Sequence, residues 1–288
     1  MHRFASFNQK ILSPEQIKLS AISSAALYGR GIFTTVAIYH QNPFLWSKHW
    51  RRLNENAQKI GIDLSEFSEI SLKTSLFELI EANKIQNSRA RITFFDESAS
   101  GIWSFETNKK TSLLITTADF LETKENFHLT VSPYRINSKS PLTNIKSCNY
   151  LENILALEDA KQTGFDEAVR LNEMDEAVSA SMANLFWITG EKIYTSALET
   201  GCLAGTMREF LIENFSVEEE KIDLADLMKA DEIFLTSAGI GIKSAAKIDE
   251  KVFDNSMTKK LQKSFSPGAH ASLRAASLEK RRKSVDVE

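Results

Sequence analysis

The sequence is poor in cysteine, proline and glycine, and each scarcity excludes a class of protein. Two cysteines, Cys148 and Cys202, are too few for a disulfide framework. Five prolines and eleven glycines exclude a collagen-like or low-complexity chain. No stretch approaches the roughly 18 consecutive apolar residues of a membrane-spanning helix. The five histidines lack metal-ligand spacing and no Cys-x-x-Cys motif occurs, so we expect no metal site.

The chain also lacks an excess of charge of either sign. Its 35 Lys and Arg residues oppose 38 Asp and Glu residues, which leaves a net charge of −3. This balance excludes a basic nucleic-acid-binding protein and an acidic disordered chain. The N-terminal segment has no apolar core typical of a signal peptide. We therefore expect a cytoplasmic protein that binds neither nucleic acid nor membranes.

What the sequence does contain is enough apolar material for two folded domains. Hydrophobic residues make up 42% of the 288 residues, with 18 Phe among them. β-branched and aromatic runs predict strands, and apolar residues three and four apart predict helices. Strands are expected at 4–11, 32–39, 44–46, 89–95, 112–117, 127–134, 167–171, 184–188, 192–194, 233–236 and 242–248. Helices are expected from an N-cap at Ser47 to about residue 60, and at 65–83, 151–163, 207–214 and 224–229.

This order of elements predicts the division of the chain. Residues 1–118 should form an α+β domain, and the charged segment 119–126 should be a linker. Residues 127–265 should form a second domain in which strands and helices alternate too irregularly for a doubly wound sheet. Residues 266–288 contain the basic cluster at 280–283 and no aromatic residue, so we expect an exposed, disordered tail.

Lys146 is the first candidate for chemistry. It follows a loop that contains Pro141 and precedes the helix expected at Leu151. A lysine removed from water has a lowered pKa and can form a Schiff base with an aldehyde. The alternative is an ordinary solvated loop lysine.

Three other segments could bind an anion. The turns at 200–209 and 236–241 are rich in small residues and offer backbone N–H groups to a phosphate. Their alternatives are a capping box from Thr206 to Glu209 and an ordinary turn. Arg51 or Arg52 could clamp an anion, or lie exposed on a helix. An amine, phosphate-binding turns and an arginine together are what pyridoxal 5′-phosphate (PLP) requires.

Six motifs connect these segments in order along the chain. They are Tyr28-Gly-Arg-Gly-Ile-Phe-Thr, His49-Trp-Arg-Arg-Leu, Asn144-Ile-Lys-Ser-Cys-Asn-Tyr-Leu-Glu-Asn, Gly164-Phe-Asp-Glu-Ala-Val-Arg-Leu-Asn, Asn184-Leu-Phe and Leu203-Ala-Gly-Thr-Met-Arg. In this order they resemble the class IV (fold type IV) PLP-dependent enzymes. That family includes branched-chain and D-amino acid aminotransferases and aminodeoxychorismate lyases. The resemblance covers about residues 28 to 265.

The resemblance implies a fold and a set of site residues. It implies a smaller N-terminal α+β domain, a larger C-terminal domain, PLP between them, and a homodimer. Lys146 takes the position of the Schiff-base lysine, and Arg52 that of the phosphate-binding arginine. The other positions implied to contact PLP are Tyr150, Ser179, Leu203, Gly205, Thr206, Met207, Ser237 and Ala238.

Several positions depart from the family pattern. Ser179 stands where the family has a glutamate that pairs with the pyridine nitrogen of PLP. Glu176 lies an odd number of residues away, so in a regular strand it points to the opposite face. Ser179 should therefore leave the ring mostly unprotonated. Met207 replaces a phosphate-binding threonine, Thr34 replaces a frequent glutamate, and Lys243-Ser244 replaces Pro-Val.

The resemblance implies an aminotransferase that exchanges the amino group of a small amino acid with a keto acid. The alternative is an aminodeoxychorismate lyase that releases pyruvate and 4-aminobenzoate, because aromatisation of the product tolerates a weaker electron sink. A PLP-binding relative without turnover is a second alternative, motivated by Ser179 and Met207. The substrate is not fixed, and Arg89, Arg91 and Trp103 are candidate lining residues.

Overall fold

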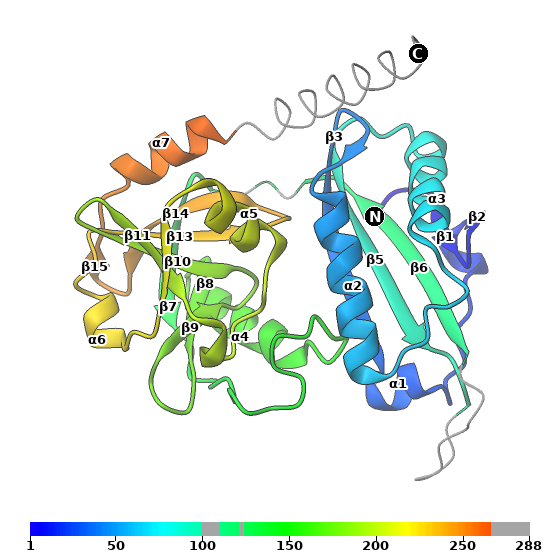
Figure 1. The fold of residues 1–288 in the computed structure, drawn as a ribbon, viewed down its shortest axis with the longest axis horizontal. Helices are drawn as coiled ribbons and strands as arrows, with labels where there is room; N and C mark the ends of the chain where they lie inside the picture. The colour runs from blue at the N-terminus through cyan, green and yellow to red at the C-terminus, as the bar shows by residue number, and fades with distance from the viewer. Residues whose placement is uncertain (100–109, 121, 123, 266–288) are drawn as a thin grey trace, which may run out of the picture.

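The computed structural model describes residues 1–99, 110–120, 122 and 124–265, and Figure 1 shows them as two sheet-containing halves. The first sheet has six strands in the order β2-β1-β6-β5-β3-β4. Its central strands β3, β5 and β6 pair antiparallel. The strands are β1 (Ala5–Phe7), β2 (Lys10–Leu12), β3 (Gly31–Tyr39), β4 (Asn42–Pro43), β5 (Ser88–Asp96) and β6 (Thr111–Ala118).

Two helices, α2 (Trp46–Ile60) and α3 (Glu69–Ala82), supply the apolar core against this sheet. Leu53, Leu72 and Leu76 are fully buried, as the three- and four-residue spacing predicted. The strand predicted at 44–46 is wrong, because Leu45 has a left-handed backbone and α2 begins at Trp46. Two short helices also belong to this half, α1 (Ser24–Tyr28) and a 3-10 turn, Pro14–Gln16.

The second sheet has nine strands along the path β12-β11-β10-β13-β14-β7-β8-β9, with β15 paired to β14. The strands are β7 (Asn126–Val131), β8 (Glu167–Leu171), β9 (Ala177–Ala180), β10 (Asn184–Thr189), β11 (Lys192–Ser196), β12 (Val217–Glu220), β13 (Glu232–Ser237), β14 (Gly241–Ile248) and β15 (Lys251–Val252). Its helices are α4 (Leu151–Gln162), α5 (Thr206–Asn214), α6 (Leu224–Leu227), α7 (Ser256–Ser264) and a 3-10 turn, Leu198–Thr200. Strands β4, β9, β12 and β15 and helices α1 and α7 had not been expected.

An aromatic cluster joins the halves. Phe44 of the first half contacts the rings of Phe210 and Phe265 of the second. In Figure 1, α2 lies on the side of the first sheet that faces the second half. The division at 118 and 127 agrees with the two sheets but remains a prediction. The tail predicted at 266–288 and positions 121 and 123 of the linker lie outside the described residues.

The described residues contain neither a membrane-spanning helix nor a metal-binding cluster. In that part of the chain, no helix combines the length and apolar character needed to cross a membrane. The same residues contain no group of three or more His, Cys, Asp or Glu side chains that could hold a metal ion.

Candidate active site

A cavity of about 1020 Å³ takes its walls from both halves of the molecule. Phe33 of β3 and Arg52 of α2 come from the first half, and β9, β10 and the start of α5 come from the second. All ten positions implied to contact PLP line this cavity. They are Arg52, Lys146, Tyr150, Ser179, Leu203, Gly205, Thr206, Met207, Ser237 and Ala238.

The backbone of Lys146 is fixed to the first sheet. The N–H of Phe33 donates to the Lys146 carbonyl at 2.9 Å, and the N–H of Cys148 donates to the carbonyl of Gly31 at 2.8 Å. Gly31 has no side chain to obstruct this contact, since a Cβ there would lie 2.8 Å from the sulfur of Cys148. The loop before α4 therefore pairs with β3 and carries Lys146 to the cavity wall.

The Lys146 amine sits in an environment that favours its neutral form. Its Nζ donates to the Tyr150 hydroxyl at 3.2 Å and lies 4.6 Å from the Phe33 ring centroid. Burial, Arg52 and Arg91 hold the pKa of Lys146 well below its ordinary value. The amine is therefore no ordinary solvated loop lysine, and a neutral amine is the form that attacks an aldehyde. Burial also raises the pKa of Tyr150, which keeps the phenol protonated.

Arg52 and the start of α5 meet at one end of the cavity. Arg52 is 8% exposed, and its Nη2 donates to the Thr34 hydroxyl at 2.7 Å. Its Nη1 donates to the Ala204 carbonyl at 3.3 Å. Within the described residues, its Nε has no hydrogen-bond partner. Burial lowers the pKa of Arg52 to about 10, so the guanidinium remains charged at neutral pH.

The capping box predicted from Thr206 to Glu209 is wrong. Gly205 is the N-cap of α5 and supplies no side-chain cap, so the first N–H groups of the helix remain available to an anion. The Thr206 hydroxyl lies 3.4 Å from His49 Nε2. A Cβ at Gly205 would lie 2.0 Å from the side-chain oxygen of Asn184, so this close approach requires glycine.

Two functional positions were missed at the sequence level. Asn184 donates to the Leu203 carbonyl at 2.7 Å and shapes the turn before α5. Fully buried His49 lies 2.6 Å from the Thr34 hydroxyl, which also accepts from Arg52. Burial, Arg52 and Lys146 lower the pKa of His49 well below its usual range, so it is neutral. Both residues begin motifs listed in the sequence analysis, and those motifs could have identified them as site residues.

Ser179 lines the cavity, and Glu176 does not. Glu176 accepts from the Asn172 amide at 2.7 Å, which holds its carboxylate elsewhere. The regular strand assumed for Glu176 is wrong, because the register of β9 against β8 shifts between Ala177 and Ser179. The hydrogen bond from Asn172, and not strand alternation, keeps the Glu176 carboxylate out of the cavity.

The remaining candidates lie at the same cavity. Ser237 ends β13 and Ala238 lies in the tight hairpin turn to β14, so this segment both turns the chain and lines the site. Arg89 and Arg91 of β5 also line the cavity, and the Arg91 guanidinium carbon lies 3.6 Å from the Phe33 ring centroid. Trp103 lies outside the described residues.

These features fit PLP. A neutral amine suits its aldehyde, and a buried guanidinium with an unpaired Nε suits its phosphate. The glycine at the N-cap of α5 lets the Asn184 side chain approach beside the free N–H groups and adds no side chain of its own.

Comparisons with known proteins agree with the geometry. A family model described as amino-transferase class IV matches residues 31–248. A putative branched-chain-amino-acid aminotransferase of Methanocaldococcus jannaschii is 27% identical over 270 residues, 90% of this chain and 93% of that protein. An aminodeoxychorismate lyase of Bacillus subtilis is 28% identical over 255 residues, 84% and 86% of the two chains.

The fold has close counterparts among solved structures. The branched-chain aminotransferase of Thermoproteus uzoniensis superposes with a TM-score of 0.85 at 23% identity, over 92% of this chain and 93% of that one. These comparisons confirm the resemblance based on the motifs and the two-sheet fold type IV architecture. The similar identities to an aminotransferase and a lyase do not distinguish the two reactions.

Proposed function

The chain belongs to the aminotransferase class IV family, and we propose that it is a PLP-dependent aminotransferase acting on a small amino acid through a Schiff base at Lys146. One observation carries this proposal. The Lys146 amine, whose neutral form is favoured by burial and by two arginines, shares a cavity with Arg52 and the start of α5. This is the arrangement needed to bind an aldehyde at one end and its phosphate at the other.

Each residue then has a distinct task. Arg52 and the N–H groups of Thr206 and Met207 hold the phosphate. Bound PLP supplies an electron sink for the charge that develops at the substrate α-carbon. With PLP bound, the Lys146 amine would accept the α-proton of the substrate and return it. Tyr150, in contact with Nζ, orients the amine.

Two arginines make the cavity suitable for an amino acid or keto acid. Arg89 and Arg91 lie on β5, two residues apart, so both side chains point to the face that lines the cavity. A guanidinium can bind a carboxylate through two parallel hydrogen bonds. We propose that one or both bind the carboxylate of the substrate.

The lyase alternative is favoured by Ser179, which lies in the cavity wall at the position where the family has a glutamate. Release of pyruvate from aminodeoxychorismate, measured beside an amino-donor screen on the same preparation, distinguishes the two reactions. Amino transfer without pyruvate release supports the aminotransferase, and the reverse supports the lyase. PLP binding with neither activity identifies a relative without turnover.

The attachment of PLP to Lys146 has a direct test. Purified protein mixed with PLP should turn yellow, and borohydride should fix the cofactor to a peptide that contains Lys146. Lys146→Ala should abolish this label. A label on another lysine contradicts the assignment.

We further propose that the enzyme works as a cytoplasmic homodimer with a smaller domain at 1–118 and a larger one at 127–265. Exposed apolar side chains beside the cavity support a self-association surface. They lie on α1 and α4 and comprise Leu27, Tyr28, Leu151, Ile154 and Leu155.

A further inference from the structure

A buried arginine stands directly opposite Ser179. In the antiparallel pair of β8 and β9, Arg170 and Ser179 are Cα partners. Directly opposed residues in such a pair project to the same face of the sheet. Arg170 is 2% exposed, and both residues line the cavity. The wall formed by β8 and β9 therefore presents a cation next to the serine.

No buried carboxylate is paired with this guanidinium in the described part of the chain. Its Nε donates to the Tyr134 carbonyl at 3.3 Å, and its Nη2 donates to the Arg135 carbonyl at 3.2 Å. The acid it approaches is Glu152, at 3.5 Å, and the Glu152 side chain is 76% exposed. Such an exposed, distant partner compensates little of the buried charge.

The two other carboxylates near this wall are engaged elsewhere. Glu167, on the same strand, accepts from the backbone N–H groups of Ala168, Ser181 and Met182 at 3.0 to 3.1 Å. Glu176 accepts from Asn172. Arg170 is therefore the charged residue that pairs directly with Ser179 across the two strands.

Lys146 and the wall of β8 and β9 line the same cavity from different sheets. Lys146 is bonded to β3 of the first sheet, whereas Ser179 belongs to the second. In PLP the ring nitrogen is para to the carbon that bears the aldehyde, so it points away from the amine that binds that aldehyde. We propose, resting on the proposed function, that Arg170 acts with Ser179 as a positioning pair that keeps the pyridine nitrogen of bound PLP unprotonated.

The physical basis is repulsion between like charges. The positive charge of the Arg170 guanidinium is incompletely neutralised, so it disfavours the protonated, positively charged form of a nearby pyridine. Ser179 can instead donate a hydrogen bond to the neutral nitrogen. The pair also makes Ser179→Glu an incomplete repair. A carboxylate placed at 179 would face Arg170 and form an ion pair with it, leaving the ring nitrogen without a proton.

The test measures the protonation state of the ring nitrogen directly. The protein is loaded with PLP labelled with ¹⁵N in the ring, attachment to Lys146 is checked with borohydride, and the ¹⁵N chemical shift is recorded at neutral pH. Wild type and Ser179→Glu should both show an unprotonated nitrogen. Ser179→Glu combined with Arg170→Met should move the signal to the protonated position. Ser179→Glu with Arg208→Met is the matched control, because Arg208 is equally buried but does not line the cavity.

Three results overturn the pairing. The first is a protonated nitrogen in wild type, which needs no variant to fold. The second is a protonated nitrogen in Ser179→Glu alone. The third is a signal of the double variant that equals that of Ser179→Glu, as a merely structural role of Arg170 predicts. If PLP does not attach to Lys146 at all, the proposed function itself is overturned. The borohydride step detects this failure separately from any failure of the Arg170–Ser179 pairing.

Discussion

At the scale of single residues, the buried cavity lysine Lys146 opposes folding of the protein without cofactor. The pKa of Lys146 is lowered in the folded chain by burial and by Arg52 and Arg91, so the unfolded chain binds more protons. The penalty is absent above the unfolded pKa of about 10.4 and grows as the pH falls below it. The lysine that we propose binds PLP therefore lowers the stability of the protein without cofactor.

Lys146→Met should consequently stabilise the protein purified without PLP. The gain should be present at neutral pH and should vanish as the pH approaches the unfolded pKa of lysine. Urea unfolding at several pH values measures it. Lys161→Met, on exposed surface of α4, is the control and should change stability little. A loss of stability in Lys146→Met at neutral pH would contradict the argument.

Adjacent arginines on α2 should differ sharply in their effects. Arg52 is buried at the cavity, whereas the Arg51 side chain is 55% exposed and bonds to Glu209. Arg52→Ala should weaken PLP binding by roughly 1.5–3 kcal/mol, the value of a hydrogen bond to a charged group. Arg51→Ala should cost at most about 1 kcal/mol, as exposed ion pairs do. Titration with PLP measures both, and equal effects would assign the phosphate contact to the wrong face of the helix.

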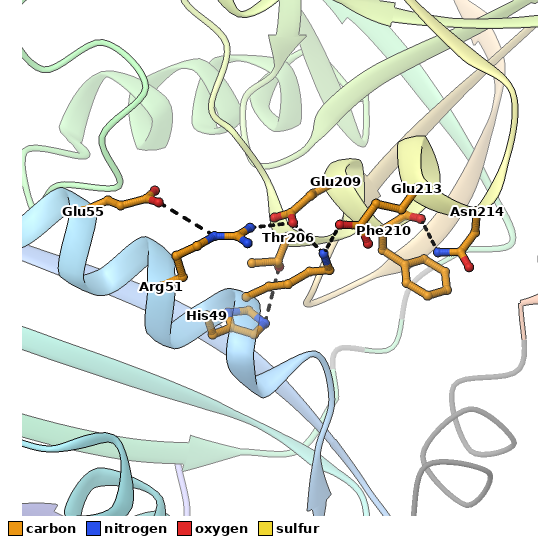
Figure 2. Close-up of polar contacts among 9 residues, drawn as sticks. His49, Arg51, Glu55, Thr206, Glu209, Phe210, Glu213 and Asn214 are labelled. Carbon is orange, nitrogen blue, oxygen red and sulfur yellow. Dashed lines mark hydrogen bonds and ion pairs between the residues drawn. The ribbon is translucent and has the colours of Figure 1, made fainter. Parts of the chain in front are cut away.

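At the scale of elements, an ion-pair cluster holds α2 against α5 (Figure 2). The Glu209 carboxylate accepts from Lys48 and from Arg51 at 2.5 Å each, and Lys48 also bonds to Glu213. Partial burial opposes ionisation, but these hydrogen bonds prevail and lower the pKa of Glu209. The cluster joins the helix that carries Arg52 to the helix that begins at Thr206.

Glu209→Gln should therefore loosen the phosphate site without touching it. We expect faster PLP release and a loss of stability of about 1 kcal/mol, with both differences shrinking in about 1 M salt, where charges are screened within about 3 Å. Since the pKa of Glu209 is lowered, its contribution should also fade as the pH falls through that pKa. Stopped-flow PLP release measures the first effect. Glu218→Gln, which removes an exposed pair with Lys192, should change neither.

The elements show where sequence patterns suffice and where they fail. The face of α3 that carries Leu72, Leu76 and Leu79 follows from apolar spacing, which depends only on local order. The start of α2 does not, because Leu45, an apolar residue with no capping side chain, takes a left-handed backbone at the N-cap. The site positions could be carried over one by one from a family pattern. The opposition of Arg170 and Ser179 could not, because register depends on a shift in β9.

At the scale of the whole molecule, the proposed homodimer would explain an apolar surface beside the cavity. Leu151 is 67% exposed at the start of α4, and Leu27 and Tyr28 are exposed on α1. Asn149 donates to the Gly29 carbonyl at 3.1 Å, so the end of α1 and the start of α4 lie together. Leu151 and Ile154 also line the cavity, which places its rim at this surface.

Leu151→Glu should therefore give a monomer and weaken PLP binding in the same step. A carboxylate buried in an apolar interface loses its hydration without gaining a partner, which opposes association. Sedimentation velocity measures the oligomeric state, and PLP titration of each species measures the linkage. Ile70→Glu is the matched control, because Ile70 is 79% exposed on α3 and does not line the cavity. A Leu151→Glu protein that remains dimeric, or a wild-type protein that is monomeric, would remove this surface from consideration as the interface.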